Sequence, residues 1–398
     1  MPTNYIKVLS ELSQKQYRII VGLMSGTSLD GLDVSLCKIE GYGLETKVTS
    51  LNFETFDYSE EIKSQIRMVF SKRNVDLQHV CLLNEFIGDL HGEIVNRALS
   101  KWGINNCEVD VIASHGQTIY HSPKRLRLKD QYGDGTLQIG DGDHIAHKTQ
   151  IITISDFRQK HIVAGGEGAP LAVYADYLLF KNSAENRIML NIGGIANFTY
   201  LPSDLKASNV FSTDVGPGNT MMDQFMQKHF NKSADFNAIV AKSGTVNDLL
   251  LQALFNHSFF DEELPKTTGP ELFNLNYLEN AINQAETYHL SLEDQMATLN
   301  MFSAKSIELA IKKCCTTEDK PVVYLSGGGI HNSLLIENLK QLLDFVAFRS
   351  IKELGINPDE KEAILFALLA NETVCGSSLK IGDAIKTPQV FMGKISLP

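Results

Sequence analysis

Three short glycine-rich turns each follow an apolar segment of the sequence. They read SGTSLDG at 25–31, NIGGIAN at 191–197 and LSGGGIHN at 325–332. Glycine lets the backbone approach a ligand closely, and consecutive backbone N–H groups with nearby hydroxyls form a concavity that binds anions. One such turn is more often structural, but three after successive apolar segments resemble a nucleotide cradle. The candidate ATP- and phosphate-binding residues are Ser25, Gly26, Thr27, Ser28, Asp30, Gly31, Asn191, Gly193, Gly194, Asn197, Gly327, Gly328, Gly329 and Asn332.

The first turn lacks the features of the two best-known phosphate loops. No lysine stands where a G-x-x-x-x-G-K-[ST] loop has one, and the segment after the turn alternates like a strand, whereas G-x-G-x-x-G opens a helix. Asp30 repels a phosphate group, but its carboxylate can hold Mg²⁺ or the water ligands of that ion. We therefore expect Mg²⁺ at Asp30, bound through water.

Four other side chains have types suited to catalysis or to substrate binding. Asp214 ends a short apolar run before Gly-Pro-Gly, and strand ends are where α/β proteins place catalytic groups. An aspartate that caps its own turn is an equally good interpretation. Arg158 follows a predicted strand and can anchor a carboxylate through its fork or pair with a neighbouring acid. His115 and Gln117 can hydrogen-bond a polyhydroxylated substrate.

These residues are distributed over alternating strand and helix patterns. Apolar runs at 18–24 and 32–39 flank the first turn, and runs at 187–192 and 198–201 flank the second, which predicts two similar hairpins. Amphipathic helical patterns and a further apolar segment follow each hairpin. The segment 110–121 indicates a strand that breaks into a polar turn at SHGQT. The pattern predicts an α/β protein with two related halves.

The chain has 398 residues, which is long enough for two domains. The polar segment KNSAEN at 181–186 is typical of a linker. We expect a helical extension at 1–17, a first domain at 18–182 and a second domain at 183–398. The last strong helical pattern begins at Asn357, a good N-cap that is followed by proline.

The composition excludes several classes of protein. The chain is 43% hydrophobic and 21% charged, as in ordinary globular proteins. Its net charge of −11 argues against nucleic acid or an anionic membrane as the main partner. The six cysteines lack the spacing of a disulfide framework or a zinc site. Because no signal peptide or long apolar segment is evident, we expect a cytoplasmic protein.

The ordered motifs resemble those of the anhydro-N-acetylmuramic acid kinase family over nearly the whole chain. The resemblance implies the duplicated actin-like (ribonuclease H-like) ATPase fold, in which two α/β domains close on ATP and Mg²⁺, and it suggests a homodimer. The matching motifs are GLMSGTSLDG (22–31), SHGQT (114–118), QIGDGD (138–143), SDFR (155–158), AGGEGAPL (164–171), LNIGGIAN (190–197), DVGPGN (214–219), PKTTGPELF (265–273) and SGGGIHN (326–332).

The family's reaction opens the 1,6-anhydro ring of a cell-wall amino sugar and phosphorylates the oxygen freed at C6. Carried onto this sequence, Asp214 resembles the general base that activates the water attacking C1, while Arg158 and Glu362 resemble sugar-binding groups. The expected substrate-binding residues are His115, Gln117, Arg158, Gly216 and Glu362.

Four positions on the sugar side depart from the family's usual pattern. His161 stands where an aspartate is usual, Glu167 replaces glutamine, Val173 replaces proline and Asp176 replaces histidine. These departures question the identity of the sugar more than the kinase chemistry. Two alternatives stay open: a kinase for another anhydro sugar such as levoglucosan, and an inactive actin-like protein that only binds nucleotide.

Overall fold

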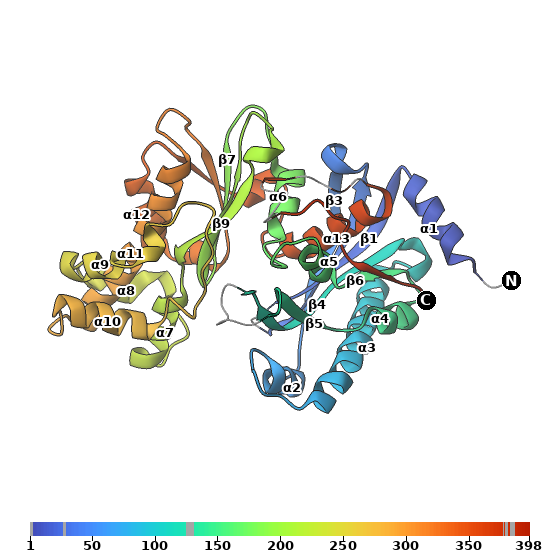
Figure 1. Ribbon diagram of the computed structural model, residues 1–398, viewed down its shortest axis with the longest axis horizontal. Helices are drawn as coiled ribbons and strands as arrows, with labels where there is room; N and C mark the ends of the chain where they lie inside the picture. Colours follow the sequence, from blue (N-terminus) through green and yellow to red (C-terminus); the bar gives the residue numbers. More distant parts are fainter. Residues whose placement is uncertain (1–2, 27–28, 125–130, 377, 379–380, 383–386) are drawn as a thin grey trace. The chain divides into compact units, whose positions relative to one another are not determined.

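The chain folds into two compact units (Figure 1). Unit 1 contains Met1–Leu179 and Asp359–Pro398, and unit 2 contains Phe180–Pro358. The first division lies beside the expected linker, whereas residues 359–398, expected in the second domain, belong to unit 1. The computed structural model describes residues 3–26, 29–124, 131–376, 378, 381–382 and 387–398.

Unit 1 is built on a mixed sheet with strand order β12-β6-β4-β1-β2-β3, and β5 pairs with β4. β1 pairs in parallel with β4 and antiparallel with β2, as the first predicted hairpin requires. Its elements are α1 (Tyr5–Gln14), β1 (Tyr17–Ser25), β2 (Gly31–Glu40), β3 (Lys47–Asp57), α2 (Glu60–Val69), α3 (Leu77–Trp102), β4 (Val111–Ser122), β5 (Gly135–Ile139), α4 (Gly142–Thr149), β6 (Thr153–Ser155), α5 (Phe157–Val163), α6 (Ala172–Phe180, whose last residue is counted in unit 2), α13 (Lys361–Cys375) and β12 (Lys394–Ser396).

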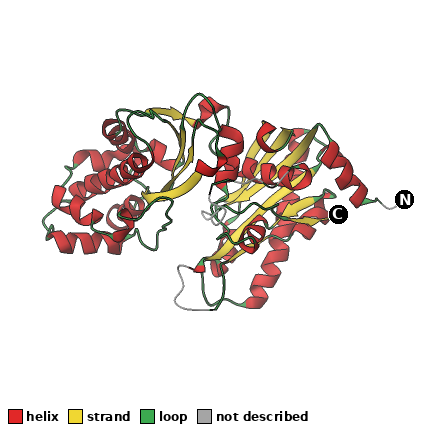
Figure 2. Ribbon diagram, turned by 45° about the horizontal axis from the view of Figure 1, so that its top comes forward, coloured by secondary structure: helices red, strands yellow, loops and turns green. Residues whose placement is uncertain are grey.

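Unit 2 repeats this topology in a sheet of order β11-β10-β7-β8-β9. Its parallel pairs β7–β10 and β10–β11 and its antiparallel pairs β7–β8 and β8–β9 match the β6-β4-β1-β2-β3 part of unit 1. Figure 2 shows both sheets with their surrounding helices. The repeat confirms the expected α/β class and the duplicated actin-like fold. Its elements are β7 (Arg187–Ile192), β8 (Ile195–Leu201), β9 (Phe211–Pro217), α7 (Thr220–Phe230), α8 (Ile239–Ser243), α9 (Asp248–Phe255), α10 (Leu275–Ala285), α11 (Leu292–Cys314), β10 (Val322–Ser326), α12 (Ser333–Leu342) and β11 (Ala347–Ser350).

Helix α13 joins unit 1 because it packs directly on β1. Successive residues of β1 face opposite sides of the sheet: Val21 and Leu23 belong to the hydrophobic cluster that includes α3, and Gly22 faces α13. A Cβ on Gly22 would lie 2.0 Å from the carbonyl oxygen of Ala363, so only glycine permits this approach. In Figure 1 the red α13 accordingly lies beside the blue β1.

The structure corrects the predicted start of α13. The helix begins at Lys361 and not at Asn357, and its N-cap, Glu360, makes no side-chain capping bond. Glu360 instead accepts a hydrogen bond from Ser50 Oγ at 2.8 Å, which ties the preceding turn to β3. This tertiary contact outweighs the local helix-start signal.

The SHGQT segment also differs from its prediction. It does not break the strand, since β4 continues to Ser122. Gln117 pairs with Ser25 of β1 on one side and with Ile139 of β5 on the other. Because both edges of β4 have partners here, the strand continues through Gly116 despite its positive φ of 76°.

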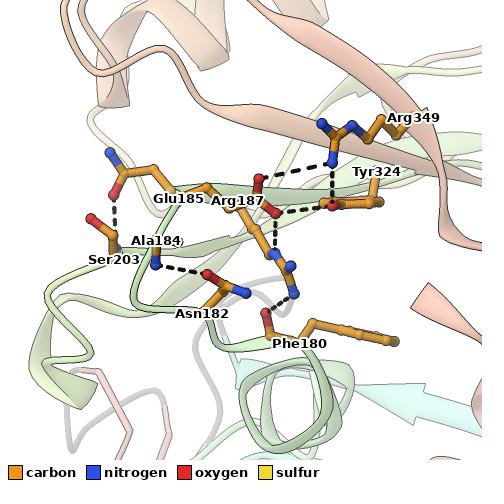
Figure 3. A network of polar contacts seen from close by, with 9 residues as sticks. Phe180, Asn182, Ala184, Glu185, Arg187, Ser203, Tyr324 and Arg349 are labelled. Carbon is orange, nitrogen blue, oxygen red and sulfur yellow. Dashed lines mark hydrogen bonds and ion pairs between the residues drawn. The ribbon is translucent and has the colours of Figure 1, made fainter. Parts of the chain in front are cut away.

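A polar network fixes the start of β7 in unit 2 (Figure 3). Glu185 Oε1 accepts hydrogen bonds from Arg187 Nε at 2.7 Å and from the Tyr324 hydroxyl at 3.0 Å, and Arg349 Nη1 lies 3.9 Å from Glu185 Oε2. Arg187 Nη1 also donates to the Phe180 carbonyl at 2.8 Å. The expected linker segment is therefore tied to the unit 2 sheet at both of its ends.

Candidate active site

The first glycine turn is supported from within unit 1 by buried side chains. Ser25 Oγ lies 2.6 Å from Gln117 Oε1 and 3.1 Å from the Gly31 carbonyl oxygen, and it accepts a hydrogen bond from the Tyr58 hydroxyl at 3.0 Å. Gln117 Nε2 donates to the Gly26 carbonyl at 3.1 Å. Ser25 and Gln117 are both fully buried, so their side chains fix the backbone of the turn from the interior of unit 1.

Two further described residues of this turn, Gly26 and Asp30, are at least partly exposed. The side chain of Asp30 is exposed, and its carbonyl accepts a hydrogen bond from the Tyr58 N–H at 2.9 Å. Gly26 is half-buried. The predicted phosphate-binding residues Thr27 and Ser28 lie outside the described residues.

Two supporting residues of the turn, Tyr58 and His91, were missed by sequence analysis. The Tyr58 hydroxyl lies 2.7 Å from His91 Nε2, in addition to its contact with Ser25. Burial lowers the pKa of His91 to about 3, so the imidazole is neutral. His91 lies in the middle of α3, far from any motif, and its helical pattern indicates only a core position.

A second cluster in unit 1 brings together the predicted sugar-binding residues His115, Arg158 and Glu362. Arg158 Nε donates to His115 Nε2 at 2.8 Å, and Arg158 Nη1 donates to the Gly168 carbonyl at 2.7 Å. Nη2 of Arg158 has no hydrogen-bond partner within the described part of the chain. Arg158 is thus held by two of its nitrogens, while the third makes no hydrogen bond to the described residues.

Electrostatics in this cluster favour an imidazole that is neutral. Burial, with a further contribution from the Arg158 charge, lowers the pKa of His115 well below its usual value. The ring also packs on Phe366 of α13, with a centroid separation of 4.7 Å. Glu362 exposes part of its surface, yet loss of water around its carboxylate raises its pKa, while Arg158 and Lys361 act in the opposite direction.

The departures from the family's pattern are accommodated inside unit 1. His161 is buried, and its Nδ1 accepts a hydrogen bond from the Gly168 N–H at 3.0 Å. Asp176 is buried and forms an ion pair with Lys361 at 2.7 Å. Val173 is fully buried, and Glu167 is half-buried. His161 therefore supports the same glycine whose carbonyl holds Arg158.

In unit 2, the sheet aligns Asp214 with two of the predicted nucleotide-binding residues. Asn191 pairs with Asn197 across the β7–β8 hairpin, and Asn197 pairs with Asp214 across β8–β9. Asp214 is half-buried and lies inside β9, whereas the sequence predicted a strand end. Asp214 Oδ2 accepts a hydrogen bond from the Thr268 N–H at 2.9 Å, which leaves a carboxylate held at a fixed place.

The two glycine turns of unit 2 pack against the end of β7. Gly218 N donates to the Gly194 carbonyl at 2.8 Å. Gly327 has a φ of 83°, and a Cβ there would lie 2.6 Å from Asn191 Oδ1. Only glycine fits such a position. Gly194 and Gly328 are exposed, so backbone at both turns remains open to a ligand.

The remaining predicted residues of unit 2 lie on the same framework. Gly193 accepts a hydrogen bond from the Asn219 N–H at 2.8 Å, and Gly329 packs on Ile192. Gly216 pairs with Ala196 in the β8–β9 ladder. Asn332 caps α12, since its Oδ1 accepts from the Leu335 N–H at 3.0 Å.

We predict that acid destabilises the fold through His91 and His115. Both have pKa values below the usual one near 6.5 in the folded chain, so only the unfolded chain binds these two protons as the pH falls below about 6.5. Between about pH 7 and pH 5.5 the free energy of unfolding should fall by about 2 kcal/mol for the two together. Urea unfolding at the two pH values measures this change, and an unchanged free energy would contradict the assignment.

The comparison with family models and the comparison with curated proteins give the same family. The family described as anhydro-N-acetylmuramic acid kinase matches residues 18–384. A protein of that name from Pseudoalteromonas atlantica is 52% identical over 99% of each chain. Another from Caldanaerobacter subterraneus is 38% identical over 98% of this chain and 99% of its own.

Among solved structures, component A of (R)-2-hydroxyglutaryl-CoA dehydratase from Acidaminococcus fermentans superposes with a TM-score of 0.42 and 11% identity, covering 90% of this chain and 99% of that one. No described helix is both long enough and apolar enough to cross a membrane. The matches over nearly the full sequence show that the chain belongs to the anhydro-N-acetylmuramic acid kinase family, whose members are phosphotransferases.

Proposed function

We propose that this chain is an ATP-dependent kinase that opens the 1,6-anhydro ring of 1,6-anhydro-N-acetylmuramic acid by hydrolysis and phosphorylates O6. The products are N-acetylmuramic acid 6-phosphate and ADP, and the reaction serves the recycling of cell-wall fragments. The observation that carries the proposal is Asp214, a half-buried carboxylate fixed by the Thr268 N–H in the same cross-strand row as Asn191 and Asn197.

In this mechanism, Asp214 takes a proton from a water molecule while the water oxygen forms a bond to C1 of the sugar. The C1–O6 bond breaks, and its electron pair stays on O6. O6 then bonds to the γ-phosphorus of ATP, and ADP leaves with the electrons of the broken phosphoanhydride bond. An aspartate suits the first step because a carboxylate can accept a proton from water and the Thr268 N–H holds this one at a fixed place.

The glycine turns suit a nucleotide's phosphate groups. At the turns of unit 2 the exposed Gly194 and Gly328 have no Cβ, so backbone N–H groups can approach phosphate oxygens. In unit 1, Ser25 and Gln117 hold the carbonyls of Gly26 and Gly31 inward. These features support ATP as the phosphoryl donor.

The residues also fit a loosely held Mg²⁺. No cluster of three or more metal-ligating side chains occurs in the part of the chain that is described. Mg²⁺ in kinases usually keeps several waters and binds through one or two carboxylates and the substrate phosphates, so the exposed Asp30 is sufficient. When bound, the ion would neutralise charge on the phosphate oxygens.

In unit 1, Arg158 and Glu362 would hold the sugar. The open Nη2 of Arg158 suits the lactyl carboxylate of the amino sugar, which levoglucosan lacks. Asp176, which departs from the family's usual histidine, forms a buried ion pair with Lys361. Because of this departure, levoglucosan or a related anhydro sugar is the alternative substrate. A homodimer acting in the cytoplasm forms part of the same proposal, on the family resemblance alone.

The substrate is tested by ADP release with each of three sugars at saturating ATP. We expect release with 1,6-anhydro-N-acetylmuramic acid, and none with levoglucosan or with N-acetylmuramic acid, which lacks the anhydro bond. Release with levoglucosan alone would assign the alternative sugar. If no sugar releases ADP while ATP still binds, the chain is a nucleotide-binding protein without catalysis, and the proposal fails.

A further inference from the structure

A short segment of unit 2 holds Asp214 through its backbone. We call residues 265–268 the Asp214 strap. The Lys266 carbonyl accepts a hydrogen bond from the Asp214 N–H at 3.0 Å, and the Thr268 N–H donates to Asp214 Oδ2 at 2.9 Å. The Lys266 N–H donates to the buried Thr213 Oγ1 at 2.9 Å. The position of the carboxylate therefore depends on the position of the strap.

The Lys266 side chain fastens the strap to the helical core of unit 2. Its Nζ lies 2.6 Å from the Phe259 carbonyl oxygen, 3.9 Å from the centroid of the Phe259 ring and 5.5 Å from that of Phe260. Phe259 is buried in the cluster that also contains Phe273 and Phe302. The charged hydrogen bond and the cation–π contacts thus join the strap to a rigid aromatic cluster.

Burial of the Lys266 ammonium group costs free energy, because the charge is removed from water. Only 7% of Lys266 is exposed, and its nitrogen has no carboxylate partner among the described residues. An apolar side chain would pack against the two rings without the cost of removing a charge from water. The fold alone does not require the charge, but exact alignment of a catalytic carboxylate benefits from a directional anchor.

We propose that Lys266 is a positioning residue for the catalytic base: its ammonium group anchors the Asp214 strap on Phe259 and so holds the Thr268 N–H on the Asp214 carboxylate. This inference rests on the proposed role of Asp214 in activating water. Thr268 Oγ1, next to this contact, is buried and has no hydrogen-bond partner within the described residues, so the strap also leaves a polar group near the carboxylate.

The anchor should weaken in mild alkali. Burial, with a further contribution from the charge of Lys313, lowers the pKa of Lys266 to about 8, while Glu262 and Asp261 act in the opposite direction. Asp214 on β9 is the other acidic residue joined to the strap. Above about pH 8 the neutral amine loses its charge-assisted hydrogen bond and its attraction to the rings, so kcat should fall as the pH rises through this value.

The test compares Lys266→Met and Lys266→Arg with Lys313→Met. Lys313 is a matched control because it is an exposed lysine whose Nζ donates to carbonyls of the same turn, those of Phe260 at 3.1 Å and Glu262 at 2.8 Å, without touching the strap. The measurements are kcat and KM from ADP release across a pH range, with melting temperatures of all variants.

We expect Lys266→Met to lower kcat roughly tenfold, about the effect of one lost hydrogen bond on the transition state, with the KM for ATP unchanged. At neutral pH, Lys313→Met should keep the kcat of the wild type. Because the charge of Lys313 lowers the pKa of Lys266, its loss should move the alkaline fall to a higher pH. Because arginine stays charged, Lys266→Arg should restore most of kcat and remove the fall above about pH 8.

Two results would overturn the inference. One is a Lys266→Met variant whose kcat equals that of Lys313→Met, and the other is a Lys266→Arg variant with the alkaline fall of the wild type. If Lys266→Met does not fold, the inference is tested by the pH profile of Lys266→Arg alone. Full turnover in Asp214→Asn would instead reject the base itself, so the failures of the two proposals are distinguishable.

Discussion

Asp214→Asn is expected to lower kcat by about 10²- to 10⁴-fold, the usual contribution of a general base. The asparagine amide oxygen can still accept the hydrogen bond that the Thr268 N–H now donates to Asp214 Oδ2, so the local structure should persist. The amide nitrogen cannot accept a proton from water, so the attack on C1 loses its base. ADP release at saturating substrates measures kcat, and calorimetry should show unchanged ATP binding.

Asp235→Asn is a suitable control for this loss. Asp235 is also an acid of unit 2 whose carboxylate accepts backbone hydrogen bonds, from Val240 and Ala241 at 2.9 Å each, but these bonds hold the first turn of α8 and involve none of the described candidate site residues. We expect a lower melting temperature and a normal kcat. Near-normal kcat in Asp214→Asn would show that another group activates the water.

The parts of the fold that sequence predicts well are set by local patterns. β7 begins and ends at the predicted residues, Arg187 and Ile192, because an apolar run stops at two glycines. The first hairpin follows for the same reason, since β1 ends at Ser25 and β2 begins at Gly31 around the SGTSLDG turn. These turns depend on residues close in sequence, and their glycines identify them directly.

The contacts that determine the rest join residues distant in sequence. The apolar stripe of α13 indicates burial, but no local signal shows that Ala363 packs on Gly22 and brings the helix into unit 1. The same limit applies inside the site. The serine and glutamine motifs mark Ser25 and Gln117 as polar and available, whereas in the fold they hydrogen-bond to each other at 2.6 Å beneath the turn.

The position of Lys266 in a family motif is a sequence signal that hydrophobic patterns do not give. Lys266 belongs to PKTTGPELF, one of the segments that resemble the family, although its chemistry is not evident from the sequence. Only the fold brings its carbonyl to the Asp214 N–H and its ammonium group to Phe259.

Arg158→Lys is expected to raise the KM for the sugar roughly 10- to 100-fold, because a lost hydrogen bond to a charged group costs about 1.5–3 kcal/mol. Arginine uses Nε on His115 and Nη1 on the Gly168 carbonyl, which leaves Nη2 for the substrate. The single ammonium group of lysine cannot reproduce this fork. It can either hydrogen-bond to His115 and the Gly168 carbonyl or reach the sugar, but it cannot do both. The KM for ATP should change little.

Arg18→Lys separates this effect from general damage to unit 1. Arg18 is buried, and all three of its nitrogens donate within the protein, to Asn371 Oδ1 at 2.6 Å and to the carbonyls of Lys15 and Gly41 at 2.7 Å each. Its loss should lower the melting temperature and leave the KM for the sugar unchanged, because no nitrogen is left over for a ligand. Equal shifts of this KM in both variants would mean that Arg158 supports the fold only. A shift confined to Arg158→Lys would mean that the third nitrogen binds the sugar, as its lack of a partner in the described residues implies.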